Sequence, residues 1–220
     1  MARSRTSGRN AREPRPRVAR AFPDGAKGPF ELGALDILRE NWYRLCDPAT
    51  PAAVKSLLRD SIEADFRCEQ PWYVGQLDVD SLQRGGDSYV VVGVMVRGFT
   101  CAARAYRELD SGGKAIGFAL AGYSSGLYTV PHIDARYALG RVHIPEPYLE
   151  FLRDNRREKV LITDHMLVTG ETVKAVAGKL RSEGVKDIYL KCNLYTGPKE
   201  KGGATYFLDI CRDARVKWHC

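Results

Sequence analysis

The sequence lacks several features that would place it in a membrane or in a secretory pathway. None of its apolar runs approaches the ~18–20 residues that a membrane helix needs. The basic N-terminal stretch has no apolar core of the kind found in a signal peptide. The six cysteines form no C-x-x-C pair and have no histidine at zinc-ligand spacing. We therefore expect a soluble, cytoplasmic protein with reduced cysteines and no membrane partner.

Two common phosphate-binding motifs are also missing. There is no G-x-x-x-x-G-K-[ST], which excludes a P-loop, and no G-x-G-x-x-G after a strand, which excludes the dinucleotide fingerprint. What remains is an ordinary globular composition: 220 residues with 44% hydrophobic side chains. This size fits one large domain, or a core domain with a small cap.

The excess positive charge lies in one segment. Residues 1–27 hold eight basic and two acidic side chains, so the rest of the chain carries 26 basic and 25 acidic ones. This segment has almost nothing to bury, and we expect a disordered basic tail. Nucleic-acid binding would have to come from this tail alone, and the sequence favours a solvated tail over a nucleic-acid partner.

The apolar spacing predicts two helices within residues 30–67, ahead of the main fold. Thr50 and Pro51 have the character of an N-cap and first helical residue for the second of them. From residue 88, strand patterns alternate with helix patterns, which predicts an α/β fold: a twisted, mostly parallel sheet flanked by helices. We expect strands at 88–96, 114–123, 159–163, 187–192 and 204–211, helices at 100–109, 147–158 and 171–184, and a loop at 124–146.

The segment 159–173, "KVLITDHMLVTGETV", combines a buried strand with polar residues at its end. Residues 169–172 would begin a helix, where backbone N–H groups, the helix dipole and threonine hydroxyls favour an anion such as phosphate. Asp164 lies on the same rim, placed to accept hydrogen bonds from sugar hydroxyls or to face a Mg²⁺-bound ligand. The residues thus predict a sugar-phosphate site.

This segment resembles the 5-phosphoribosyl-1-diphosphate (PRPP) binding motif of type I phosphoribosyltransferases. That motif has four apolar residues, two acids, a few further residues and then Thr-Gly-x-Thr. The order of the surrounding elements is also similar. "GVMVRGFT" stands where the family has its pyrophosphate loop, 124–146 where it has a mobile loop, and "KLRSEGVKDIYLKC" follows as helix and strand. The resemblance covers roughly residues 75–212.

The resemblance implies a layout and a reaction. It implies a helical hood at 28–75, a core at 76–220 and a homodimer. The activity would be Mg²⁺-dependent transfer of ribose 5-phosphate from PRPP to a nucleobase-like nitrogen acceptor, with release of pyrophosphate. The implied site residues are Asp164 at the ribose hydroxyls and indirectly at the metal, Thr169, Gly170, Glu171 and Thr172 at the 5′-phosphate, Arg97 and Gly98 at the pyrophosphate, and Lys191 at the acceptor.

The sequence departs from the family pattern at several positions. His165 replaces the second acid, Val168 stands where 6-oxopurine enzymes carry an acid, and Phe99 replaces a glycine and is expected to crowd the pyrophosphate loop. Two readings of His165 stay open. It is either a catalytic residue, such as a general base for an unusual acceptor, or the mark of an inactive domain that binds PRPP or a nucleotide as a regulator.

Overall fold

The computed structural model describes most of the chain outside its N-terminal segment. The described residues are 29–67, 82, 86–96, 98–123, 141–195 and 203–218. The predicted basic tail, Arg97 and most of the predicted loop 124–146 lie outside them. Among the described residues, no helix has the length and apolar character needed to cross a membrane.

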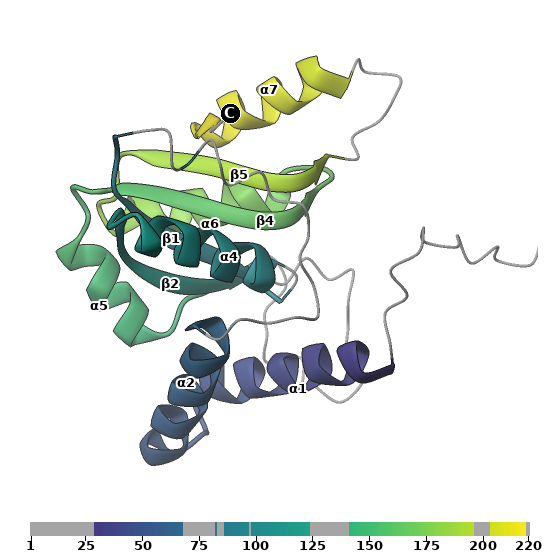
Figure 1. Ribbon diagram of the computed structural model, residues 1–220, viewed down its shortest axis with the longest axis vertical. Helices are drawn as coiled ribbons and strands as arrows, with labels where there is room; N and C mark the ends of the chain where they lie inside the picture. Colours follow the sequence, from purple (N-terminus) through teal and green to yellow (C-terminus); the bar gives the residue numbers. More distant parts are fainter. Residues whose placement is uncertain are drawn as a thin grey trace, which may run out of the picture.

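A single six-stranded sheet forms the centre of the described structure (Figure 1). Its spatial order is β3-β2-β1-β4-β5-β6. All neighbouring strands are parallel except β3, which runs antiparallel to β2. The predicted mostly parallel α/β sheet is confirmed. The strands are β1 (Tyr89–Met95), β2 (Ala115–Tyr123), β3 (Val142–His143), β4 (Lys159–Leu167), β5 (Ile188–Tyr195) and β6 (Lys217–Trp218).

Helices cover both faces of this sheet (Figure 1). The helices are α1 (Pro29–Cys46), α2 (Ala52–Arg67), α4 (Gly98–Ser111), α5 (Glu146–Asp154), α6 (Glu171–Ser182) and α7 (Gly203–Ala214). α4 lies against β1, where a Cβ atom on Gly93 would come within 2.7 Å of the Ala102 side chain. α5 packs against β2 on the other face, where Gly117 leaves room for the ring of Phe151. Glycine in these two strands therefore allows close packing of helix on sheet.

The two N-terminal helices pack onto the core. The indole Nε1 of Trp42 would lie 2.6 Å from a Cβ atom on Gly122, so α1 sits directly on β2. Phe66 of α2 stacks on Phe118, with ring centroids 4.1 Å apart, and meets Phe99 edge-on. Burial of these aromatic rings joins the two helices to the sheet. The predicted pair of helices is confirmed, although α2 begins at Ala52 rather than at Pro51.

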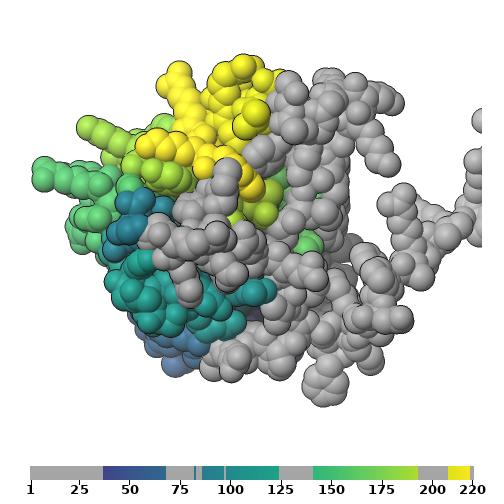
Figure 2. All heavy atoms as spheres, turned by 45° about the horizontal axis from the view of Figure 1, so that its top comes forward, coloured from purple at the N-terminus to yellow at the C-terminus, as the bar shows by residue number. Residues whose placement is uncertain are grey.

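Two predicted strands are wrong in extent or kind. Residues 204–211 form α7, not a strand. The buried residues there, Ile210, Cys211 and Ala214, follow helical spacing, while Leu208 is exposed; the β-branched and aromatic content misled the strand prediction. Figure 2 shows this helix, in yellow, on the molecular surface. The second correction is that β4 continues through Leu167 and does not end at residue 163.

Candidate functional site

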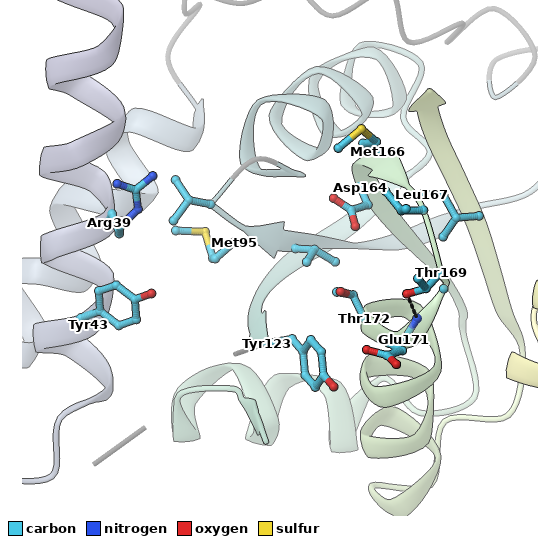
Figure 3. A pocket seen from close by; sticks show the side chains of 14 residues that line it. Arg39, Tyr43, Met95, Tyr123, Asp164, Met166, Leu167, Thr169, Glu171 and Thr172 are labelled. Atoms are coloured by element: carbon cyan, nitrogen blue, oxygen red, sulfur yellow. Dashed lines mark hydrogen bonds between the residues drawn. The ribbon is translucent and has the colours of Figure 1, made fainter. Parts of the chain in front are cut away.

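The carboxyl ends of β1 and β4 lie side by side at the point where the chain changes direction across the sheet. From β1 the chain continues to β2 on one side, and β4 pairs with the other side of β1. Open α/β sheets bind ligands at such a switch point. A cavity of about 440 Å³ opens here, within the usual size range for small-molecule sites. It is lined by Arg39, Tyr43, residues 94–96, Tyr123, Asp164 and residues 166–172 (Figure 3).

Asp164 supplies a carboxylate to this cavity from within β4. Its side chain is 9% exposed, and its Oδ1 accepts a hydrogen bond from the backbone N–H of His165 at 2.7 Å. The thiols of Cys101 and Cys192 lie close enough for the carboxylate to act on them. Burial, and secondly the charge of Asp164, raise the pKa of both thiols to about 12. The acid thus faces the cavity and lies close to two buried thiols that stay protonated at neutral pH.

The turn before α6 has the geometry of an anion site. Gly170 has a φ of +78° and forms the N-cap of α6 without a capping side chain. The Thr169 hydroxyl accepts a hydrogen bond from the backbone N–H of Glu171 at 3.4 Å. Thr172 lies in the first turn and also lines the cavity (Figure 3). Helix N-termini of this kind attract phosphate. The structure therefore brings together Asp164 and the whole predicted 169–172 turn.

His165 and Lys191 are not among the residues that line the cavity. Because β4 continues past Asp164, successive side chains point to opposite faces of the sheet. His165 therefore points away from the face that Asp164 occupies. Lys191 pairs in register with Thr163, so it shares the face of His165, and it is only 4% exposed. Their predicted roles as a catalytic and an acceptor-binding residue remain predictions.

Gly98 lies beside Asp164 without lining the cavity. A Cβ atom on Gly98 would lie 2.8 Å from the carbonyl oxygen of Thr163 and 3.1 Å from the Cα of Asp164. The start of α4 therefore touches the backbone of β4 next to the acid. Arg97, its predicted partner at the pyrophosphate, lies outside the described residues.

Two of the three departures from the family pattern take definite places. Val168 is 42% exposed and lines the cavity, so an apolar side chain occupies that position in the site. Phe99 is 1% exposed and packs against Phe66 in the core. It does not line the cavity, so the expected crowding of the pyrophosphate loop by its ring is not found there.

Three polar residues of the cavity escaped the sequence analysis. Arg39 and Tyr43 enter from α1, and Tyr123 ends β2 (Figure 3). Burial raises the pKa of Tyr43, while the nearby charge of Arg39 lowers it. Arg39 and Tyr43 are four residues apart and next to the buried stripe of Leu38 and Trp42. That spacing marks a common helix face and was the available signal.

The cavity does not contain a preformed metal cage. Among the described residues, no group of three or more His, Cys, Asp and Glu side chains is arranged to hold a metal ion. The carboxylates at the cavity are those of Asp164 and Glu171. Mg²⁺ is often held by one or two carboxylates together with the phosphates of a ligand. The residues therefore fit a Mg²⁺ ion that arrives with a diphosphate, and Asp164 would reach it indirectly, through the ligand or a water molecule.

The buried thiol of Cys101 predicts how stability depends on pH. The folded chain keeps this proton until about pH 12, whereas the unfolded chain releases it near the ordinary value of 9.0. Its contribution to stability is therefore full below 9 and is lost as the pH rises toward 12. Just above pH 9, we expect the unfolding free energy of the wild type to fall more steeply with pH than that of Cys101→Ala, by about 1 kcal/mol per pH unit. Urea unfolding of both proteins across this range measures the difference; equal slopes would contradict it.

Comparison with known proteins finds similarity only at the level of structure. No family model matches the chain, and no curated protein is similar to it in sequence. The similar solved structures include adenine phosphoribosyltransferase from Saccharomyces cerevisiae, with 14% identity over 76% of this chain and 78% of that chain and a TM-score of 0.37. The Trypanosoma brucei enzyme, in complex with AMP, pyrophosphate and ribose-5-phosphate, has 14% identity over 82% and 77%, with a TM-score of 0.40. The Rhodothermus marinus enzyme has 18% identity over 86% and 97%, with a TM-score of 0.39.

Proposed function

We propose that the protein is a Mg²⁺-dependent phosphoribosyltransferase. It would transfer ribose 5-phosphate from PRPP to a nucleobase-like nitrogen acceptor and release pyrophosphate. The observation that carries the proposal is the convergence of Asp164 and residues 166–172 on one cavity. A buried carboxylate and a helix N-terminus with two threonines face the same space at the carboxyl edge of the sheet. These are the donors and acceptors that a sugar phosphate requires.

The proposed reaction replaces one bond at the anomeric carbon of the ribose. The C–O bond to pyrophosphate breaks and a C–N bond to the acceptor forms, with positive charge developing on the sugar between the two events. The acceptor nitrogen gives up its proton to the departing pyrophosphate or to solvent. The 169–172 turn holds the 5′-phosphate through backbone N–H groups, and Asp164 accepts hydrogen bonds from the ribose hydroxyls. Mg²⁺, when bound, would neutralise charge on the departing pyrophosphate. The rate then depends on positioning and electrostatics more than on covalent catalysis.

The remaining lining residues favour a flat acceptor. Tyr43 of α1 and Tyr123 of β2 both line the cavity (Figure 3). Aromatic rings in these places suit a planar heteroaromatic molecule, which they can contact face or edge. Val168 adds an apolar contact at the position where 6-oxopurine enzymes carry an acid.

The proposal is tested by measuring pyrophosphate release from PRPP across a panel of nucleobases. We expect turnover with at least one acceptor, and loss of that turnover when EDTA removes Mg²⁺, because the departing diphosphate then lacks its counter-charge. Calorimetry with PRPP and Mg²⁺ provides the matching binding measurement. The proposal is overturned if no acceptor gives turnover and PRPP does not bind.

A second candidate function is a catalytically inactive domain that binds PRPP or a nucleotide as a regulator. The place of His165 favours it, because the residue that stands for the second acid is not among those that line the cavity. The phosphate turn itself remains complete. Saturable PRPP binding without release of pyrophosphate would select this function, and measurable turnover would reject it.

A further inference from the structure

We propose that a second cavity, separate from the first, binds a small organic anion with an apolar body. This cavity has a volume of about 530 Å³ and lies where α1 and α2 meet β3, α5 and α6. It shares no lining residue with the cavity at Asp164. The inference does not depend on the proposed transferase activity.

One face of α2 is turned toward this cavity. Ala52, Lys55, Ser56 and Arg59 line it, and their spacing of three and four residues places them on a single side of the helix. No residue from 52 to 61 is buried, in contrast to Ile62 and Phe66 further along the helix. In the first half of α2, Leu58 is partly buried against the core, and Ala52, Lys55, Ser56 and Arg59 line the cavity.

More basic than acidic side chains line the cavity. Three basic residues, Lys55, Arg59 and Lys179, line it, but the only acidic lining residue is Glu146 among the described residues. Arg59 approaches Asp60 at 3.5 Å and Glu63 at 3.7 Å. Lys55 makes no ion pair with any described residue. Its ammonium group is thus available to a ligand anion.

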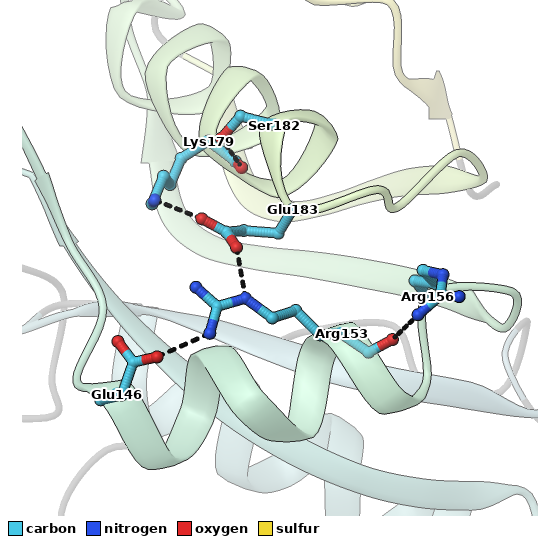
Figure 4. Close-up of polar contacts among 6 residues, drawn as sticks. All are labelled: Glu146, Arg153, Arg156, Lys179, Ser182 and Glu183. Carbon is cyan, nitrogen blue, oxygen red and sulfur yellow. Dashed lines mark hydrogen bonds and ion pairs between the residues drawn. The ribbon is translucent and has the colours of Figure 1, made fainter.

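Two of the charged lining residues are already fixed by an ion-pair chain. Arg153 of α5 binds Glu146 and Glu183, at 2.6 Å in each case, and Glu183 also binds Lys179 (Figure 4). This chain joins α5 to α6 and balances its own charges. Because Glu146 and Lys179 already have ion-pair partners, recognition of an additional anion falls to Lys55 and Arg59 on α2.

The rest of the cavity wall is apolar. Leu45, Ile144 and Leu149 are all buried or nearly so and contribute hydrocarbon surface. Pro145 and Pro147 add further apolar surface without side-chain donors. We expect the ligand to place its anionic group at Lys55 and Arg59. Its hydrocarbon or aromatic body would then lie against the apolar wall. Nucleoside monophosphates and medium-chain carboxylates share this chemistry.

The test uses 1-anilinonaphthalene-8-sulfonate, an aromatic sulfonate whose fluorescence rises on binding in apolar surroundings. We expect saturable binding to the full chain, weakened roughly tenfold or more in K55Q/R59Q because the charge-assisted contacts are lost. Arg39→Gln, which removes the one basic residue found to line the first cavity within the described part of the chain, and Lys186→Gln, which removes an exposed charge elsewhere, are expected to leave the affinity for the dye unchanged. Lys55→Gln alone serves if the double variant does not fold, because Lys55 has no ion pair to lose among the described residues.

Competition with AMP and with octanoate separates the two possible sources of the anion. Displacement of the dye by AMP that persists in Arg39→Gln and is weakened in K55Q/R59Q assigns the second cavity to a nucleotide, and the same pattern with octanoate assigns it to an aliphatic carboxylate. The proposal is overturned if neither displaces the dye, if K55Q/R59Q binds it as tightly as the wild type, or if Arg39→Gln abolishes binding instead.

Discussion

Replacing Asp164 with Asn is expected to reduce the PRPP-dependent release of pyrophosphate about 100-fold or more. The amide keeps the size of the side chain but removes its negative charge and one hydrogen-bond acceptor. Both matter at a site where positive charge develops on the sugar and where a Mg²⁺-bound diphosphate must be positioned. Steady-state kinetics with saturating Mg²⁺ gives the change in kcat/KM.

Asp110→Asn provides the matched control for this substitution. Asp110 is exposed near the end of α4 and does not line the cavity, so its loss of charge should leave turnover unchanged. Unfolding curves of both variants establish that the fold is kept. If Asp164→Asn turns over as fast as the wild type, Asp164 does not contact the reacting sugar and the proposed mechanism is wrong.

The second large effect is expected from Gly170→Ala at the start of α6. The added Cβ would lie 2.3 Å from the Cγ2 of Ile210, which is 2% exposed in α7, and would occupy a backbone φ of +78°. The left-handed conformation and the overpacking together should lower the unfolding free energy by about 2–4 kcal/mol. Because the turn must change shape, the affinity for PRPP should fall with it. Urea unfolding and calorimetry measure the two losses.

Gly178→Ala in the same helix is the control for that substitution. A Cβ atom at position 178 meets nothing within 4 Å, and the backbone there is helical. Helix propensity then favours alanine by about 0.5–1 kcal/mol, so this variant should be slightly more stable than the wild type. If Gly170→Ala and Gly178→Ala lower the unfolding free energy by similar amounts, the close contact with Ile210 does not explain the loss at position 170.

The sequence predicted most of the sheet and one half of the candidate site. Runs such as 88–96 were recognisable because strands covered on both faces are continuously apolar. The 169–172 turn was recognisable because a glycine between threonines at a helix start has few other uses. Both patterns lie within a single segment, so the structure of that segment can be predicted from its own residues.

The parts that escaped prediction depend on contacts between distant segments. The opposite orientations of Asp164 and His165 follow from the continuation of β4, which pairing with β5 through Tyr195 stabilises. The entry of Arg39 and Tyr43 into the cavity depends on where α1 lies on β2. Ile210 of α7 lies close to Gly170 at the start of α6. These contacts join segments far apart in the sequence, so the pattern within one segment does not specify them.

The packing of Trp42 against Gly122 has a consequence for the fluorescence of the protein. The indole is 2% exposed and lies in a rigid contact, and the next residue along α1, Tyr43, faces the candidate site. Any ligand that draws α1 toward the cavity or pushes it away must alter the surroundings of this ring. The chain has three tryptophans, so the part of the emission that is lost in Trp42→Phe reports, without any label, on the surroundings of α1 at the sheet.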